Sequence, residues 1–273
     1  MSRITEKFLE LKTKKQCAFV AYICAGDPNY NTSLEILKGL PKAGADIIEL
    51  GIPFLDPAGD GPLIENASKR AIKNGASLKK TLLMVEEFRK TNQETPIALM
   101  SYFNPIFKYG YEKFFQDASA SGVDGVLIVD LPFEENEEIF SFSKKSNINI
   151  DLISLIAPTT GEDRIKKITT RTSGFSYLIS MLGITGTKLA KIEENKINLQ
   201  KIRNNSNLPT VIGFGIKEPK QAAEFAKIGA DGIVVGSAFV KEIDESFSAK
   251  KSQTEIVEIT LKKVAEFSQA IKN

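Results

Sequence analysis

The stretch AGADIIELGIPF, residues 43–54, contains the pattern that decides the fold. A helical segment ends at a glycine, a small residue and an aspartate follow, and a short apolar run then begins. The same unit recurs as SGVDGVLIVDLPF at residues 121–133 and as IGADGIVVGSAF at residues 228–239. Uninterrupted apolar runs of this length are typical of parallel strands covered on both faces, so the repeats indicate alternating helices and parallel strands.

Five further apolar runs bring the number of predicted strands to eight. They are AFVAYIC (18–24), PIALMS (96–101), NIDLISLI (149–156), GFSYLIS (174–180) and PTVIGFG (209–215). Helical periodicity fills the intervals, for example at residues 32–40, 82–89, 111–120 and 220–228. Eight strand–helix units in 273 residues predict an α/β protein, a (β/α)8 TIM barrel in one domain over residues 1–273, with an extra amphipathic helix at the N-terminus.

An open, doubly wound sheet would use the same alternation of strands and helices. The chain lacks the glycine-rich fingerprint that follows the first strand in nucleotide-binding sheets of that kind. Its longest connections follow the second and sixth predicted strands, and in a barrel such loops lie on the catalytic face. We therefore favour the barrel.

Composition limits the partners and the chemistry. The 36 Lys and Arg residues nearly balance the 34 Asp and Glu residues and are scattered, which argues against a nucleic-acid or membrane partner. No run could span a bilayer, the N-terminus does not resemble a targeting peptide, and two cysteines suit a reducing compartment, so we expect a cytoplasmic protein. The absence of histidine excludes histidine-based triads and leaves an improbable ligand set for zinc, so we expect no metal.

Two acids are the candidate catalytic residues. Glu49 ends an apolar run at the carboxyl end of the second predicted strand, where burial should raise its pKa and suit it to proton transfer. An ion pair at the barrel rim is the alternative. Asp60 follows in the loop IPFLDPAGDGPLIENAS, whose Pro and Gly residues define an irregular path before a helix begins near Pro62. Asp56, in the same loop, could equally be a turn or capping residue.

Glycine-rich loops predict a phosphate site. Glycine lets backbone N–H groups approach an anion, and a helix N-terminus adds a favourable dipole. The loops after the seventh and eighth strands form the usual phosphate site of barrel enzymes, although a single glycine could equally form a tight turn, as we favour for Gly183. The loops are Gly183-Ile184-Thr185-Gly186, Gly213-Phe214-Gly215 and Gly236-Ser237.

A set of motifs, taken in order, resembles the α chain of tryptophan synthase over almost the whole chain. The motifs are ELGIPFLDPAGDGP (49–62), NPIFKYG (104–110), GVDGVLIVDLPFEE (122–135), APTT (157–160), LGITGT (182–187), IGFGI (212–216) and VVGSAFV (234–240). The resemblance implies a lyase that cleaves indole-3-glycerol phosphate to indole and glyceraldehyde 3-phosphate, without a cofactor in this subunit.

The resemblance also implies roles for individual residues. Glu49 matches the family's proton-transfer residue, and Asp60 matches the carboxylate that accepts a hydrogen bond from the indole N–H. For the apolar pocket residues, simple packing of the barrel interior remains the alternative. The implied substrate-binding residues are Tyr22, Met100, Leu127, Val129, Ile153, Tyr177 and Thr185, and the implied phosphate-binding residues are Gly186, Gly215, Gly236 and Ser237.

A partner chain is implied as well, namely a tryptophan synthase β chain that holds pyridoxal phosphate, in an α2β2 heterotetramer. The sequence adds an independent indication, because residues 52–55 and 102–107 place bulky apolar side chains in loops on the predicted catalytic rim. The alternative is that these loops fold inward over the substrate.

Some positions depart from the family pattern without touching either acid. They affect the loops that close over substrate in the family, and with them signalling to the β chain. A catalytically weak chain that mainly activates its β partner therefore remains the alternative function. A Schiff-base aldolase would need a lysine at the carboxyl end of a strand, and none stands there. The departures are Leu55, Gly59, Glu65, Met181 and Leu182.

Overall fold

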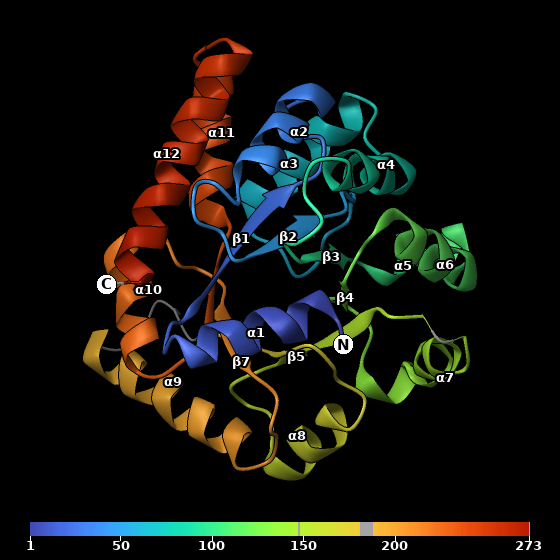
Figure 1. The fold of residues 1–273 in the computed structure, drawn as a ribbon, viewed down its shortest axis with the longest axis vertical. Helices are drawn as coiled ribbons and strands as arrows, with labels where there is room; N and C mark the ends of the chain where they lie inside the picture. The colour runs from blue at the N-terminus through green and yellow to red at the C-terminus, as the bar shows by residue number, and fades with distance from the viewer. Residues whose placement is uncertain (147, 181–187, 273) are drawn as a thin grey trace.

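Eight parallel strands close into a barrel in sequence order, and β8 pairs with β1. The computed structural model describes residues 1–146, 148–180 and 188–272 (Figure 1). The predicted barrel is confirmed. The alternative prediction of an open doubly wound sheet is wrong, because an open sheet has two edge strands and this sheet is closed. The strands are β1 (Ala18–Cys24), β2 (Ile47–Gly51), β3 (Ile97–Ser101), β4 (Gly125–Ile128), β5 (Asp151–Ile156), β6 (Ser176–Ile179), β7 (Thr210–Gly213) and β8 (Gly232–Val235).

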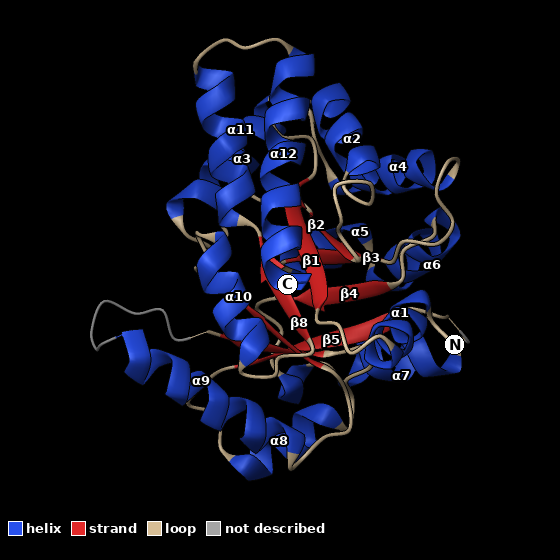
Figure 2. Cartoon of the chain, turned by 60° about the vertical axis from the view of Figure 1, so that its left-hand side comes forward, coloured by secondary structure: helices blue, strands red, loops and turns tan. Residues whose placement is uncertain are grey.

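Helices surround the strands on the outside of the barrel (Figure 2). The long connection after β2 carries two of them, α3 and α4. In the described part of the chain, no helix is long and apolar enough to cross a membrane. The helices are α1 (Arg3–Thr13), α2 (Tyr30–Gly39), α3 (Pro62–Lys73), α4 (Leu78–Arg89), α5 (Phe103–Tyr109), α6 (Tyr111–Ser121), a 3-10 turn (Phe133–Glu135), α7 (Glu137–Lys145), α8 (Glu162–Thr169), α9 (Lys188–Arg203), α10 (Pro219–Lys227), α11 (Ser237–Ser248) and α12 (Gln253–Lys272).

Two apolar cores follow from the alternation of side chains along each strand. One lies between the sheet and the surrounding helices, and the other fills the barrel interior. The expected N-terminal helix, α1, crosses the amino-terminal end of the barrel (Figure 1), and its Ile4, Phe8 and Leu11 are buried in the interior core. The ring of Phe8 packs 5.7 Å from that of Phe175. Because α1 covers this end, a site inside the barrel must open at the carboxyl end.

The aspartate of each repeated unit joins two neighbouring strands. In all three units its N–H donates to a carbonyl at the start of the preceding strand, at 2.8 to 3.0 Å, and its carboxylate accepts the N–H of the same residue, at 2.7 to 2.8 Å. This reciprocal pair fixes the register of two strands at their amino ends. The pairs are Asp46 with Phe19, Asp124 with Ile97 and Asp231 with Thr210.

Asp124 also forms a buried ion pair. Its carboxylate accepts hydrogen bonds from Arg89 at 2.7 Å and from Arg3 at 2.8 Å. Arg89 in turn donates to the carbonyls of Gly122 and Thr95, at 2.9 and 2.7 Å. The cluster thus ties α1 and α4 to the start of β3 and β4.

We expect Asp124→Asn to destabilise the protein far more than Asp231→Asn. The Asp124 side chain is 4% exposed and its loss leaves Arg89 buried without a counter-charge, which costs about 3 kcal/mol. The Asp231 side chain is 39% exposed and its partner Arg203 is 38% exposed, so that change costs at most about 1 kcal/mol. Urea denaturation of both variants measures the two losses, and equal losses would contradict this assignment.

Candidate active site

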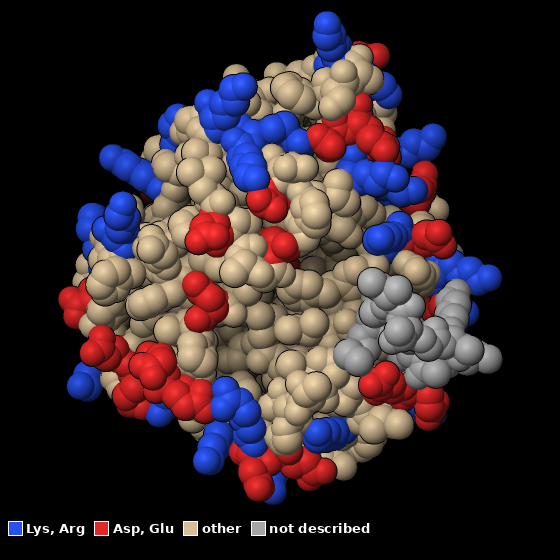
Figure 3. All heavy atoms as spheres, turned by 180° about the vertical axis from the view of Figure 1, so that it is seen from behind, with Lys and Arg blue, Asp and Glu red and all other residues tan. Residues whose placement is uncertain are grey.

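Predicted catalytic and binding residues from distant parts of the sequence line one cavity of about 360 Å³. The cavity lies at the carboxyl end of the barrel, on the face opposite α1, and Figure 3 shows this face hollowed near its centre. Among the described residues that line it, Lys217 is the one cation, and neither it nor Leu63, Ile64 and Ile216 was predicted. The predicted residues in its wall are Tyr22, Glu49, Asp60, Met100, Tyr177, Gly215, Gly236 and Ser237.

Glu49 is buried without a hydrogen-bond partner on one of its oxygens. Register places it beside Tyr22 of β1 and Ala98 of β3, and its side chain faces the barrel interior. It is 3% exposed, and its Oε1 accepts no hydrogen bond from any described residue. Burial, and secondly the charge of Asp60, raise the pKa of Glu49 to about 8. At neutral pH this carboxyl is therefore a proton donor.

Asp60 stands in the loop between β2 and α3, and α3 begins two residues later at Pro62, as the sequence predicts. Burial raises the pKa of Asp60 to about 6, and a hydrogen bond from the hydroxyl of Tyr102 opposes this shift. Two carboxyls in one cavity thus have separated pKa values. Such separation is how a site holds an acid and a base together at one pH.

Tyr102, which lies between β3 and α5, donates a hydrogen bond to Asp60. Its hydroxyl also accepts the N–H of Gly59 at 3.0 Å, and its ring lies 5.6 Å from that of Phe54. The sequence pattern placed Tyr102 among the bulky rim residues that a partner chain was predicted to cover. At 3% exposure it instead points inward, so for this residue the alternative of an inward fold is correct.

Backbone N–H groups line the cavity at the loops after β7 and β8. Phe214 and Gly215 both have a positive φ, of +76° and +73°, and no described residue accepts the N–H of Gly215 or of Ile216. Beside this turn α11 begins at Ser237, so first-turn N–H groups lack partners within the helix. The Ser237 hydroxyl donates to the carbonyl of Ile216 at 3.5 Å and links the two loops. The arrangement suits a phosphate.

Glycines make room for the two tyrosines of the cavity. A Cβ at Gly213 would lie 2.1 Å from the hydroxyl of Tyr177, and one at Gly236 would lie 2.7 Å from the ring of Tyr22. Any side chain at either glycine would displace a tyrosine from the cavity wall. Close approach therefore requires glycine at both positions, apart from any role in binding an anion.

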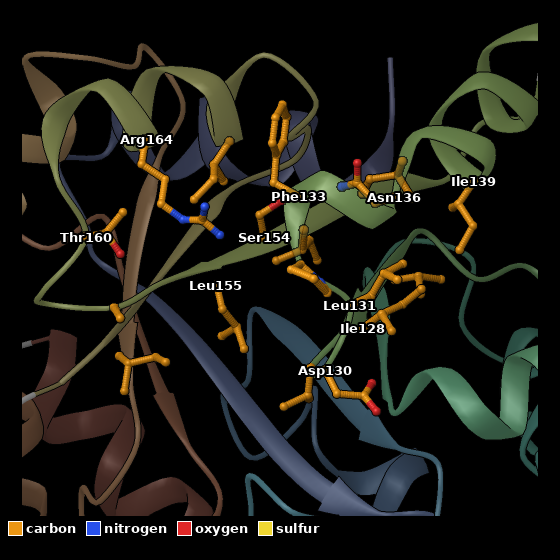
Figure 4. A pocket seen from close by; sticks show the side chains of 18 of the residues that line it. Ile128, Asp130, Leu131, Phe133, Asn136, Ile139, Ser154, Leu155, Thr160 and Arg164 are labelled. Atoms are coloured by element: carbon orange, nitrogen blue, oxygen red, sulfur yellow. The ribbon is translucent and has the colours of Figure 1, made fainter.

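The residues predicted to form one apolar pocket lie in different places in the structure. Leu127 is 2% exposed in the barrel interior and does not line the acid cavity. Val129 and Ile153 line a second cavity, of about 710 Å³, at the carboxyl ends of β4 and β5. Figure 4 shows Arg164, Asn136 and other residues around it. Among the described residues, those that line this cavity include neither of the two acids and none of the glycines of the loops after β7 and β8.

Other predicted positions lie elsewhere. Leu55 is 59% exposed on the rim, and Glu65 forms a surface ion pair with Lys69 at 2.5 Å. Within the described ranges no three His, Cys, Asp or Glu side chains gather as metal ligands would. Outside the described residues lie Met181, Leu182, Gly183, Thr185 and Gly186.

Known proteins resemble this chain over its whole length. Residues 8–272 match the protein family described as the tryptophan synthase alpha chain. Tryptophan synthase subunit alpha of Legionella pneumophila strain Paris is 38% identical, with a TM-score of 0.89 over 99% of this chain and 98% of that one. A structure from Aquifex aeolicus is 36% identical, with a TM-score of 0.87 over all of both chains.

A more distant structure agrees. Tryptophan synthase of Mycobacterium tuberculosis, in an aminoacrylate-bound form, is 27% identical and has a TM-score of 0.85 over all of both chains. The match in sequence extends through the strands and loops that form the acid cavity. The chain therefore belongs to the tryptophan synthase alpha chain family, whose members are lyases of tryptophan biosynthesis.

Proposed function

We propose that this chain cleaves indole-3-glycerol phosphate to indole and glyceraldehyde 3-phosphate by a retro-aldol reaction. One observation carries the proposal: a buried acid, Glu49, whose Oε1 has no hydrogen-bond partner among the described residues, shares a cavity with a second acid, Asp60, and with the N–H groups around Gly215 and Ser237. The cavity thus offers a proton donor, an acceptor and an anion site to one substrate.

The proposed cycle uses Glu49 twice. Its carboxyl, held neutral by burial, gives a proton to C3 of the indole. Asp60 accepts a hydrogen bond from the ring N–H and stabilises the positive charge that then develops on the ring. As the bond between C3 and the side chain breaks, the Glu49 carboxylate takes the proton of the side-chain hydroxyl. Indole and an aldehyde leave, and Glu49 is protonated again.

Different groups of the cavity would bind the two ends of the substrate. Backbone N–H groups of the loops after β7 and β8 would hold the phosphate, and Tyr22, Met100 and Tyr177 would contact the indole ring. The protonated indole ring itself accepts the electron pair of the C–C bond that breaks, so the cycle needs no electron sink beyond the substrate. We therefore infer that this chain uses no organic cofactor.

We also propose a β chain as partner, which would hold pyridoxal phosphate and take up the indole. Its docking surface would be the rim of the carboxyl face. Leu55 and Phe107 there are 59% and 66% exposed, which is unusual for large apolar side chains in a lone chain. An α2β2 assembly would cover them. A chain that served only to activate the β chain would have no use for an unpartnered buried acid.

Removing the acids tests the reaction. We expect Glu49→Gln to lower kcat by about 10²- to 10⁴-fold, the usual contribution of a general acid, and Asp60→Asn to lower it by about 10²-fold or more. Indole release from indole-3-glycerol phosphate, with and without a β chain, is the measurement. Glu35→Gln removes an exposed acid of α2, outside the cavity, and should change kcat less than twofold. Unchanged turnover in Glu49→Gln would exclude the proposed cycle.

The pH dependence of kcat/KM should show two limbs. Activity rises as Asp60 ionises near pH 6 and falls as Glu49 loses its proton near pH 8. In Asp60→Asn the acid limb should disappear from the residual activity. The basic limb should move to lower pH, because the charge of Asp60 no longer raises the pKa of Glu49. An acid limb that persists in this variant would assign it to another group.

The burial of Glu49 should make the free energy of unfolding depend on pH. Folding raises the pKa of Glu49 from 4.5 to about 8, so its contribution to stability is complete below pH 4.5 and is lost as the pH rises toward 8. In the Glu49→Gln variant the side chain at this position has no proton to lose in this pH range. From pH 5 to pH 8, the free energy of unfolding of the variant should therefore rise relative to that of wild type by on the order of 3 kcal/mol. Denaturant unfolding at both pH values measures this, and a constant difference would contradict the raised pKa.

A further inference from the structure

The turn after β7 has a backbone that its sequence does not favour. Phe214 has φ of +76°, in the left-handed region that costs free energy for any residue with a Cβ, and Gly215 follows with φ of +73°. Both residues line the acid cavity. A non-glycine residue persists in this conformation only where its surroundings hold it.

Ser180, the residue after β6, makes two hydrogen bonds to this turn. Its N–H donates to the carbonyl of Gly213 at 2.8 Å, and its hydroxyl donates to the carbonyl of Phe214. The side chain is 8% exposed, so water competes little for the bond. From the same strand, the ring of Tyr177 packs edge-on against that of Phe214, with centroids 5.7 Å apart.

The bond to the Phe214 carbonyl orients the next N–H group. In a trans peptide the carbonyl and the N–H point in opposite directions from one rigid plane. Because the Phe214 carbonyl points to Ser180, the N–H of Gly215 points away from Ser180, and Gly215 itself lines the cavity. No described residue accepts the N–H of Gly215 or of Ile216. These donors are therefore available to an anion in the cavity.

We propose that Ser180 is a positioning residue of the phosphate site. Its hydroxyl holds the Phe214–Gly215 peptide plane, so that the N–H of Gly215 points at the phosphate of the substrate. Ser180 does not itself contact the substrate. The inference rests on the proposed function, because it takes the group held by this turn to be the phosphate of indole-3-glycerol phosphate.

The strand offers a matched control. Ser176 lies on β6, is fully buried, and its hydroxyl has no partner among the described residues. Ser176→Ala therefore removes the same atom from β6, four residues before Ser180, without breaking a hydrogen bond to any described residue. Ser180→Thr keeps a hydroxyl, and Ser180→Cys keeps the shape but donates only weakly.

The test measures binding of inorganic phosphate and of indole to each variant by calorimetry, together with kcat and KM for indole-3-glycerol phosphate. We expect Ser180→Ala to raise the Kd of phosphate and the KM of the substrate by about five- to tenfold, the effect of one misplaced hydrogen bond. The effect on kcat should be under twofold, and the Kd of indole should not change. Ser180→Thr should restore most of the affinity, and Ser176→Ala should match wild type.

Each outcome decides the inference. Equal phosphate affinity in Ser180→Ala and wild type would overturn it and leave the proposed function intact. Equal losses in Ser180→Ala and Ser176→Ala, or a loss in kcat alone, would also overturn it. A wild-type protein that binds neither phosphate nor substrate would instead contradict the proposed function. Should the alanine variant fail to fold, Ser180→Cys supplies the same comparison and should also weaken phosphate binding.

Discussion

The N–H of Asp46 donates to the carbonyl of Phe19, and the N–H of Phe19 donates back to the Asp46 carboxylate. This reciprocal pair sets β2 beside β1 in one register, and equivalent pairs do the same for β4 beside β3 and β8 beside β7. The side chains of a strand alternate between its faces, so a slip of one residue would turn Glu49 from the cavity into the helix layer. The chemistry at the carboxyl end thus depends on hydrogen bonds at the amino end.

The barrel confines the acid site in two ways. α1 fills the amino-terminal end with apolar side chains, so water and substrate reach the interior only from the other side. At that side Glu49 is 3% exposed, and none of the described residues donates a hydrogen bond to its Oε1. An unsatisfied buried carboxyl destabilises a fold, and its presence is therefore a strong indication of function. Asp60 differs because Tyr102 donates to it, which favours its ionised form.

The two cavities of the carboxyl face differ in what they can bind. The acid cavity is lined by residues of β1, β2, β3, β6 and β8 and of the loops after β2, β7 and β8, and it combines carboxyls and tyrosines with backbone N–H groups that no described residue accepts. The larger cavity beside β4 and β5 is lined mostly by apolar side chains, and its Arg164 is already paired with Glu134. These groups are why we propose that proton transfer and anion binding take place in the smaller cavity. The turn that we propose to bind the phosphate is held by Ser180, whose hydroxyl donates to the carbonyl of Phe214.

Much of this protein could be predicted from its sequence, because the signals are local. Apolar runs, helix-ending glycines and the Pro62 helix start specify the strands, the helices and hence the barrel, and an acid within an apolar run identifies Glu49. Local patterns also locate the glycine loops. Only the tertiary structure brings Tyr102 to Asp60 and Ser180 to Phe214, and only it moves Val129 and Ile153 to the wall of another cavity. Such contacts join residues far apart in the chain, and they depend on register, side-chain direction and peptide orientation, which no local pattern records.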